Sequence, residues 1–168
     1  CKYNTGLEAL VVKGCLVSEH AVILILDYLI NLSVLTIKDS EFCYCRFFQR
    51  LRRSLPRLKK FNLKNLLSCK IGKPLLFNEK ISNLEKLGYL NLPILKENFS
   101  CLINKFRDSL TVIKINALNL TDDNIQEITK CYNLKTLRLD NAETITDKGL
   151  IKMSKLKLNA VYFTCFDL

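Results

Sequence analysis

Hydrophobic and polar positions alternate in short blocks that recur about every 25 residues along the chain. Each block reads L-x-x-L-x-L, with Ile, Val, Phe or Tyr also allowed at the apolar positions. The seven blocks are Leu7/Leu10/Val12, Leu32/Leu35/Ile37, Leu58/Phe61/Leu63, Leu87/Leu90/Leu92, Leu110/Ile113/Ile115, Leu134/Leu137/Leu139 and Leu158/Val161/Phe163. Because successive side chains of a strand point to opposite faces, the alternation predicts one half-buried strand in each block.

Most of the segments between these strands have the features of helices. Ser18, Thr121 and Thr146 are residues of the type that caps a helix N-terminus, and apolar positions at helical spacing follow them. Ser40 or Asp39 can cap another helix, and Pro74 suits a first helical position. The predicted helices cover residues 19–30, 41–51, 74–81, 97–106, 122–131 and the segment after Thr146.

One strand and one helix cannot enclose a core, so these units must stack on one another. The blocks start 25, 26, 29, 23, 24 and 24 residues apart, within the range of leucine-rich repeats. We therefore expect an α/β fold: a right-handed leucine-rich repeat solenoid, or horseshoe, of about seven repeats. Its parallel strands would form the concave face and its helices the convex face.

Residues 134–150, with the sequence LKTLRLDNAETITDKGL, resemble the cysteine-containing subclass of leucine-rich repeats found in F-box proteins. Ala142 stands at the usual cysteine of that pattern, and Cys131 matches the cysteine that precedes the next strand. The second, third and fourth repeats depart from the subclass pattern. The resemblance implies a protein-protein interaction scaffold, in the role of the substrate-recognition part of an F-box-type ubiquitin ligase receptor. The sequence contains no segment that resembles an F-box.

The length of 168 residues suits one leucine-rich repeat domain over residues 1–168. The chain starts with Cys1, and the last block is not followed by a polar capping unit, which solenoids need for solubility. We therefore expect a fragment of a longer repeat array. The longest apolar run, AVILILDYLI, contains Asp27 and is too short to span a membrane. We expect a monomer without a membrane span.

The repeat register also predicts which side chains lie on the concave face, where such proteins bind their partners. The first, fourth and sixth positions of each block are apolar, so the third, fifth and seventh point outward. Lys13, Lys38 and Lys64 take the seventh position in three consecutive strands. Such a row is typical either of a solvated surface or of a site for an acidic or phosphorylated peptide. The predicted partner-binding residues are Lys13, Lys38, Lys60, Lys64, Lys114, Arg138, Tyr89 and Tyr162.

The net charge of +10 arises in one window, because residues 46–73 contain ten Lys and Arg residues and no Asp or Glu. A solvated helix face is one interpretation of this window. The other is a basic patch that docks an acidic protein, nucleic acid or anionic lipid. The patch residues are Arg46, Arg50, Arg52, Arg53, Arg57 and Lys59.

The eight cysteines occur about once per repeat, at 1, 15, 43, 45, 69, 101, 131 and 165. This spacing favours buried thiols over disulfides or a zinc site, and a cytoplasmic or nuclear location. Three glycosylation sequons leave a secreted leucine-rich repeat protein as an alternative. The single histidine, His20, has no partner motif, and Asp122 and Asp123 fit helix-terminus charges. We therefore expect no catalytic site, no metal and no cofactor.

Overall fold

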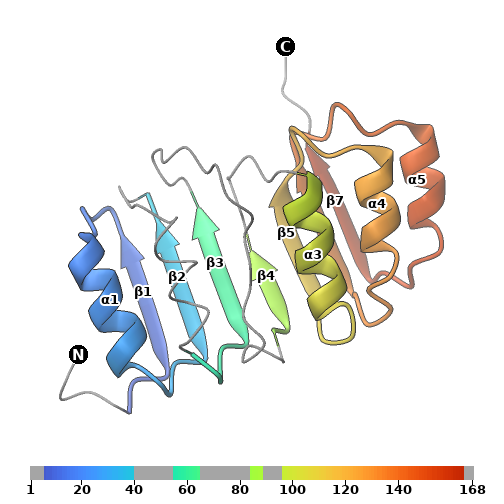
Figure 1. Cartoon of the computed structure of the whole chain (residues 1–168). Coiled ribbons are helices and arrows are strands. Elements are labelled where there is room, and N and C mark those ends of the chain that lie inside the picture. The colour runs from blue at the N-terminus through green and yellow to red at the C-terminus, as the bar shows by residue number, and fades with distance from the viewer. Residues whose placement is uncertain (1–5, 40–54, 65–83, 89–95, 165–168) are drawn as a thin grey trace.

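The computed structural model describes residues 6–39, 55–64, 84–88 and 96–164 of the chain. The described strands are β1 (Ala9–Lys13), β2 (Val34–Lys38), β3 (Lys60–Lys64), β4 (Lys86–Gly88), β5 (Val112–Asn116), β6 (Thr136–Asp140) and β7 (Ala160–Thr164). The described helices are α1 (Glu19–Tyr28), α3 (Lys96–Phe106), α4 (Asp122–Ile128) and α5 (Asp147–Met153). All seven strands are parallel and form one sheet in chain order, from β1 to β7 (Figure 1).

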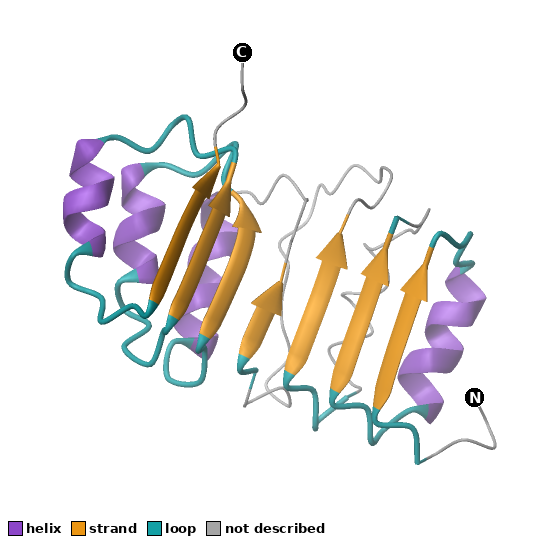
Figure 2. Ribbon diagram, turned by 180° about the vertical axis from the view of Figure 1, so that it is seen from behind, coloured by secondary structure: helices purple, strands orange, loops and turns teal. Residues whose placement is uncertain are grey.

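The four described helices all lie on one face of the sheet, as the front and back views together show (Figures 1 and 2). The core fills the space between the helices and this face of the sheet. Leu35, Ile113 and Leu137 contribute to it from the strands, and Phe99 and Ile125 contribute from the helices, all with no exposed surface. The predicted α/β class with one parallel sheet is therefore confirmed.

The strand register confirms six of the seven predicted blocks. In β5 and β6, for example, the fourth and sixth positions of the block are buried in the core, and the residue between them is more exposed. Neighbouring blocks pair position for position, so that Leu35 lies beside Phe61 and Leu137 beside Val161. A period-two pattern that buries one face specifies the register, because a slip of one residue would expose the whole apolar row.

The predicted position of the fourth block was wrong by three residues. Phe61 pairs with Leu87, and Leu87 pairs with Ile113, so Leu87 holds the fourth position of its block and not the first. The first position belongs to Leu84, which is 1% exposed. The repeat lengths on either side thereby become 26 and 26 residues in place of the predicted 29 and 23.

A repeated hydrogen-bond pattern joins each unit to the next just before the strands begin. The backbone carbonyl of Glu8 accepts from the N–H groups of Ser33 and Val34, at 2.7 and 3.0 Å. The same pattern recurs at every step along the sheet and ends at the carbonyl of Lys135. After β1, β2 and β6 the chain turns through residues with positive φ, namely Gly14, Asp39 and Asn141. Gly, Asp and Asn adopt positive φ more readily than other residues, which explains why they occupy these turns.

The predicted caps lie at the starts of their helices. The Ser18 hydroxyl accepts from the Ala21 N–H at 3.2 Å, and Thr146 is the N-cap of α5. The helix predicted over residues 97–106 is α3. The helices predicted over 19–30 and 122–131 end earlier than expected, at α1 and α4. Those predicted over residues 41–51 and 74–81 lie outside the described residues.

Asp122, at the start of α4, also fixes the start of α5. Its carboxylate accepts from the Thr146 hydroxyl at 2.6 Å and from the Thr146 N–H at 2.9 Å. The hydroxyl bond is the main reason why the pKa of Asp122 lies below its usual value of 3.8, and the backbone bond acts in the same direction. Asp122 is therefore a helix-terminus charge, as predicted, and it also ties two consecutive repeats together.

In the described part of the chain, no helix combines the length and the apolar character needed to cross a membrane.

Candidate protein-binding surface

The sheet face that carries no described helix is here named the open face. It consists of the third, fifth and seventh positions of each block, because the alternate positions enter the core. In β5, for example, Ile113 and Ile115 are fully buried, whereas Lys114 between them is exposed. Strands in a sheet lie about 4.8 Å apart, so the open face presents its side chains in closely spaced rows.

Lysines dominate the open face from β1 to β5. Lys13, Lys38 and Lys64 pair in register across β1, β2 and β3, which places three cationic positions in one row, as predicted. Lys13 is exposed and Lys38 half-buried. Lys60 and Lys114 also belong to the open face and are exposed. Neighbouring like charges repel one another, and a bound anion would relieve this repulsion.

A further lysine on the open face was missed by the sequence analysis. The corrected register of β4 puts Lys86 directly beside Lys60, and Lys86 is exposed. The more even spacing of 26 and 26 residues was the signal that could have found it, since Leu84, Leu87 and Tyr89 also fit the block pattern. Tyr89 itself, a predicted binding residue, lies outside the described residues.

The open face loses its net charge toward β6 and β7. The guanidinium of Arg138 donates from Nε to Oδ1 of Asp140 at 2.9 Å, and the Thr164 hydroxyl donates to the same oxygen at 3.0 Å. Asp140 is the single acidic residue at the described open-face positions, and it is 9% exposed. Tyr162 follows on β7 with 52% of its surface exposed. An acidic group would therefore be attracted to β1–β5, whereas β6 and β7 offer a neutral aromatic surface.

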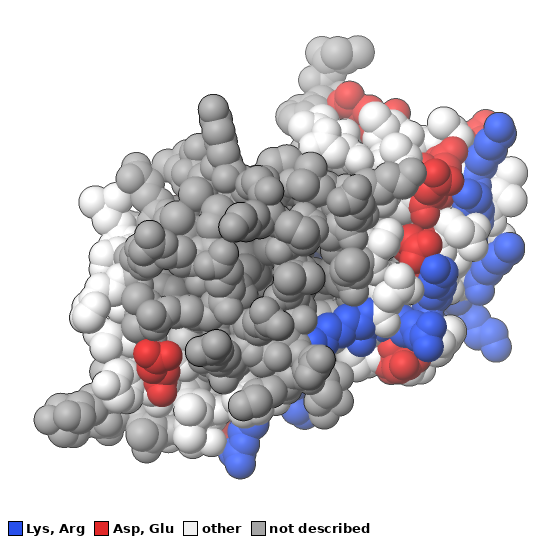
Figure 3. Space-filling view, in the orientation of Figure 1, with Lys and Arg blue, Asp and Glu red and all other residues white. Residues whose placement is uncertain are grey.

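The helix-bearing side has a different charge pattern. Over α3, α4 and α5, Lys and Arg side chains are interspersed with Asp and Glu (Figure 3). Two ion pairs are part of this pattern, Lys130 with Glu127 at 2.6 Å and Lys152 with Asp123 at 4.0 Å. Mixed charges of this kind suit a solvated surface. The cationic character is thus stronger on the open face than over these helices.

Four of the six residues of the predicted basic patch lie outside the described residues, namely Arg46, Arg50, Arg52 and Arg53. Arg57 and Lys59 lie in the turn before β3 and are exposed. The side chain of Lys64 is likewise not described.

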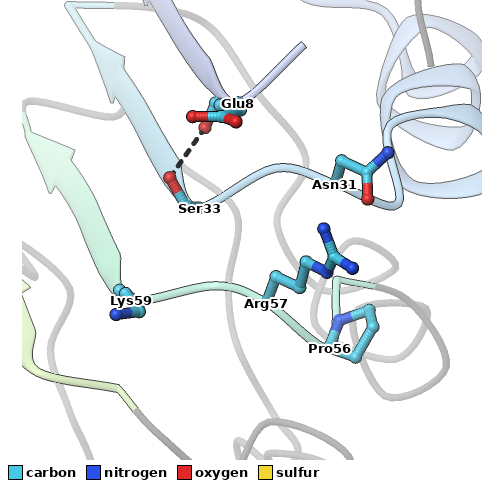
Figure 4. Close-up of a pocket in the computed structure, with 6 residues that line it drawn as sticks. All are labelled: Glu8, Asn31, Ser33, Pro56, Arg57 and Lys59. Carbon is cyan, nitrogen blue, oxygen red and sulfur yellow. Dashed lines mark hydrogen bonds between the residues drawn. The ribbon is translucent and has the colours of Figure 1, made fainter. Parts of the chain in front are cut away.

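Arg57 and Lys59 contribute to a hollow of about 450 Å³ beside the starts of β1, β2 and β3 (Figure 4). Lys59 is paired with Glu85, from Nζ to Oε1, at 3.2 Å. The Ser33 hydroxyl donates to the Glu8 carbonyl at 3.1 Å. The remaining lining residues are Glu8, Asn31 and Pro56. Because one lysine is neutralised and a glutamate is present, this hollow attracts an anion less strongly than the open face does.

At the opposite end of the sheet, β7 exposes apolar positions that are buried in β2, β5 and β6. Val161 and Phe163 are 43% and 40% exposed, whereas Leu137 and Leu139, at the same positions of β6, are fully buried. The prediction that these block positions are buried was thus wrong for β7, because no described strand lies beyond it. They line an apolar hollow of about 340 Å³ together with side chains of α5 and the loop after it.

Cys15 and Cys131 are both free thiols, and they differ in their surroundings. Cys131 is fully buried, and this desolvation raises the pKa of its thiol to about 12, with a smaller contribution from Asp108. Burial was therefore correctly predicted for Cys131. It was wrong for Cys15, which is exposed because the chain turns out of the sheet at Gly14. The described residues contain no group of three or more His, Cys, Asp or Glu side chains that could hold a metal ion.

These features define an α/β protein with a single parallel sheet and a cationic open face over β1–β5. No protein-family model matches the chain, and no curated protein is significantly similar to it.

Proposed function

We propose that this chain is a leucine-rich repeat solenoid with a horseshoe shape. The period of the blocks, the strand order from β1 to β7 and the position of the described helices on one face all support this architecture. The repeated carbonyl that accepts from two N–H groups before each new strand also supports it. A solenoid of this kind leaves a long row of strand residues uncovered, which suits the binding of a protein partner.

The proposed function is to act as a non-catalytic scaffold that binds an acidic or phosphorylated protein partner on the open face. The observation that carries this proposal is the pairing of Lys13 with Lys38, in register, on a sheet face that no described helix covers. Complementary charge speeds the encounter of two proteins and selects among partners.

The resemblance to the cysteine-containing subclass extends this proposal to the substrate-recognition part of an F-box-type ubiquitin ligase receptor. The coding sequence upstream of Cys1 tests this role directly. An F-box encoded there would support it, whereas a complete reading frame without one would leave a free-standing adaptor. The thiols of Cys15 and Cys131 favour a cytosolic or nuclear location over a secreted one. Eight reactive thiols in the denatured, unreduced protein would exclude the secreted alternative.

Binding of a fluorescent deca-glutamate peptide, followed by anisotropy over a salt series, tests the open face. The variant Lys13→Ala/Lys38→Ala should bind roughly 10-fold more weakly at low salt, if each exposed charge pair contributes up to about 1 kcal/mol. It should also depend less on salt, because fewer charges are screened. The control Lys155→Ala/Lys157→Ala removes two exposed lysines from the loop between α5 and β7 and should bind like the wild type. Equal affinities for all three proteins would reject the proposal.

Nucleic acid is the alternative ligand for the basic residues. The ion pair between Lys59 and Glu85 weakens this alternative, because it neutralises one residue of the basic patch. Filter binding of RNA and DNA across the same salt series separates the two functions. Retention of either nucleic acid at physiological salt, without binding of deca-glutamate, would favour the alternative.

A further inference from the structure

The short strand β4 brings three lysines together around a residue that has no side chain. Gly88 lies beside Lys114 of β5, and Lys86 is two residues before Gly88 on the same strand and face. Lys60 of β3 lies beside Lys86 and hence diagonally from Gly88. Diagonal neighbours across strands lie about 7–8 Å apart, within the reach of long side chains. The three lysines can therefore direct their ammonium groups to one place above Gly88.

Gly88 holds an open-face position and contributes no side chain to that face. A glycine within a strand often marks a place where a ligand or another chain approaches the backbone closely. Here the Asn62 side chain from β3 leans toward it, with Oδ1 only 2.9 Å from the position of an added Cβ atom. The Oδ1 atom is buried and has no hydrogen-bond partner within the described part of the chain. A polar group without a partner thus lies at the base of the lysine cluster.

The three lysines differ from the basic side chains near them in their pairing. Lys59, just before β3, is paired with Glu85, and Arg138 on β6 is paired with Asp140. Within the described residues, Lys60, Lys86 and Lys114 form no ion pair. The cluster therefore concentrates three positive charges at one point, whereas Lys13 and Lys38 continue along the row. A single anion with several charges and several acceptor oxygens suits such a cluster better than separate carboxylates.

We propose that Lys60, Lys86 and Lys114 bind one phosphoryl group of a phosphorylated side chain on the protein partner, with Gly88 beneath it. A phosphorylated side chain has a charge of about −1.5 to −2 and three strong acceptor oxygens, which match three ammonium donors. This proposal rests on the proposed function and adds to it the chemical group and the residues that recognise it.

Titration of the ¹⁵N-labelled protein with three short peptides tests this inference. The peptides are identical except for a central phosphoserine, glutamate or serine, and the backbone N–H signals of Gly88 and Lys114 report binding. The phosphoserine peptide should shift both signals to saturation and bind at least roughly 5-fold more tightly than the glutamate peptide, because it adds charge and acceptors. Equal affinity of the phosphoserine and glutamate peptides, or no shift at Gly88, would overturn the proposal.

The variant Lys60→Ala/Lys86→Ala tests the assigned residues. It should bind the phosphoserine peptide roughly 10-fold more weakly than the wild type, a few-fold for each exposed lysine. Lys155→Ala/Lys157→Ala, with the same change in net charge, should leave the affinity unchanged. An equal loss in both variants would overturn the assignment, because it would reflect net charge alone.

Two further results separate this inference from the proposed function. A decauridylate RNA that shifts the Gly88 signal and binds with higher affinity than the phosphoserine peptide would overturn the inference in favour of nucleic acid. Binding of deca-glutamate that depends on Lys13 and Lys38, together with no response of Gly88 to the phosphoserine peptide, would overturn the phosphoryl site and leave the proposed function intact.

Discussion

Replacing Gly88 with alanine tests whether β3 and β4 pair in the register described. In this register Gly88 lies beside Asn62, and an added Cβ atom would lie 2.9 Å from Asn62 Oδ1 and 3.3 Å from Asn62 Cβ. Non-bonded heavy atoms prefer about 3.5–4.0 Å. The alanine methyl group and the Asn62 amide cannot both keep their positions, so the Asn62 side chain must move.

The expected free-energy changes follow from two opposing effects. Alanine in the interior of a strand is more stable than glycine by about 0.5–1 kcal/mol, because glycine loses more freedom on folding. Moving Asn62 off its preferred rotamer costs about 0.5–1.5 kcal/mol. Gly88→Ala alone should therefore change the free energy of unfolding by less than about 1 kcal/mol. In the Asn62→Ala background the second effect is absent, and Gly88→Ala should stabilise the protein by about 0.5–1 kcal/mol.

Urea denaturation of the wild type, both single variants and the double variant measures the coupling between the two positions. Residues in contact typically show coupling energies of about 0.5–3 kcal/mol, and we expect about 1 kcal/mol here. Gly88→Ala combined with Thr136→Ala is the control, since β6 is two strands from β4. Additive changes for Gly88 and Asn62, within the error of the control pair, would refute the register and with it the placement of Lys86 on the open face.

Three other predictions follow from the described residues. Leu137→Ala, at a fully buried position, should lower the free energy of unfolding by about 2.7–5 kcal/mol in urea denaturation, and Leu137→Met by less than about 1.5 kcal/mol. Similar small losses for both variants would contradict the close packing around Leu137. Because the pKa of Asp122 is lowered on folding, its stabilising effect is complete above the usual value of 3.8 and is lost as the pH falls through the lowered pKa. Thermal denaturation between pH 2 and 7 should therefore show a weaker acid dependence for Asp122→Asn than for the wild type, and identical profiles would show that its hydrogen bonds contribute nothing. A thiol reagent at pH 8 should modify Cys15, which is exposed, much faster than Cys131, whose pKa is about 12. Mass spectrometry after a short reaction would locate the label, and rapid labelling of Cys131 would contradict its burial.

The residues of the candidate site could be predicted from the sequence wherever the register of their strand could be predicted. Lys13, Lys38 and Lys114 were assigned to the open face from the alternation of their own strands, and the structure places them there. Lys86 was missed because residues 84–92 fit the block pattern in two ways. The two ways differ by three residues, an odd number, so they assign opposite faces to every side chain of the strand.

Caps were also predictable, since they depend on residues a few positions apart. Ser18 and Thr146 cap α1 and α5, and each acts through its own hydroxyl and an N–H group of the following turn. The bond from Thr146 to Asp122 was not predictable in the same way. It joins residues 24 positions apart that only the stacking of two repeats brings together.

The sequence by itself determined the period, the direction of side chains within most strands and the starts of the helices. These properties follow from local alternation and local hydrogen bonding, which are read from residues close together in the chain. Tertiary structure alone decided how β4 pairs with its neighbours and which apolar residues of β7 remain exposed. The register of a strand depends on its pairing with another strand, and the burial of a residue depends on its neighbours in space. Neither can therefore be read from one segment of the sequence alone.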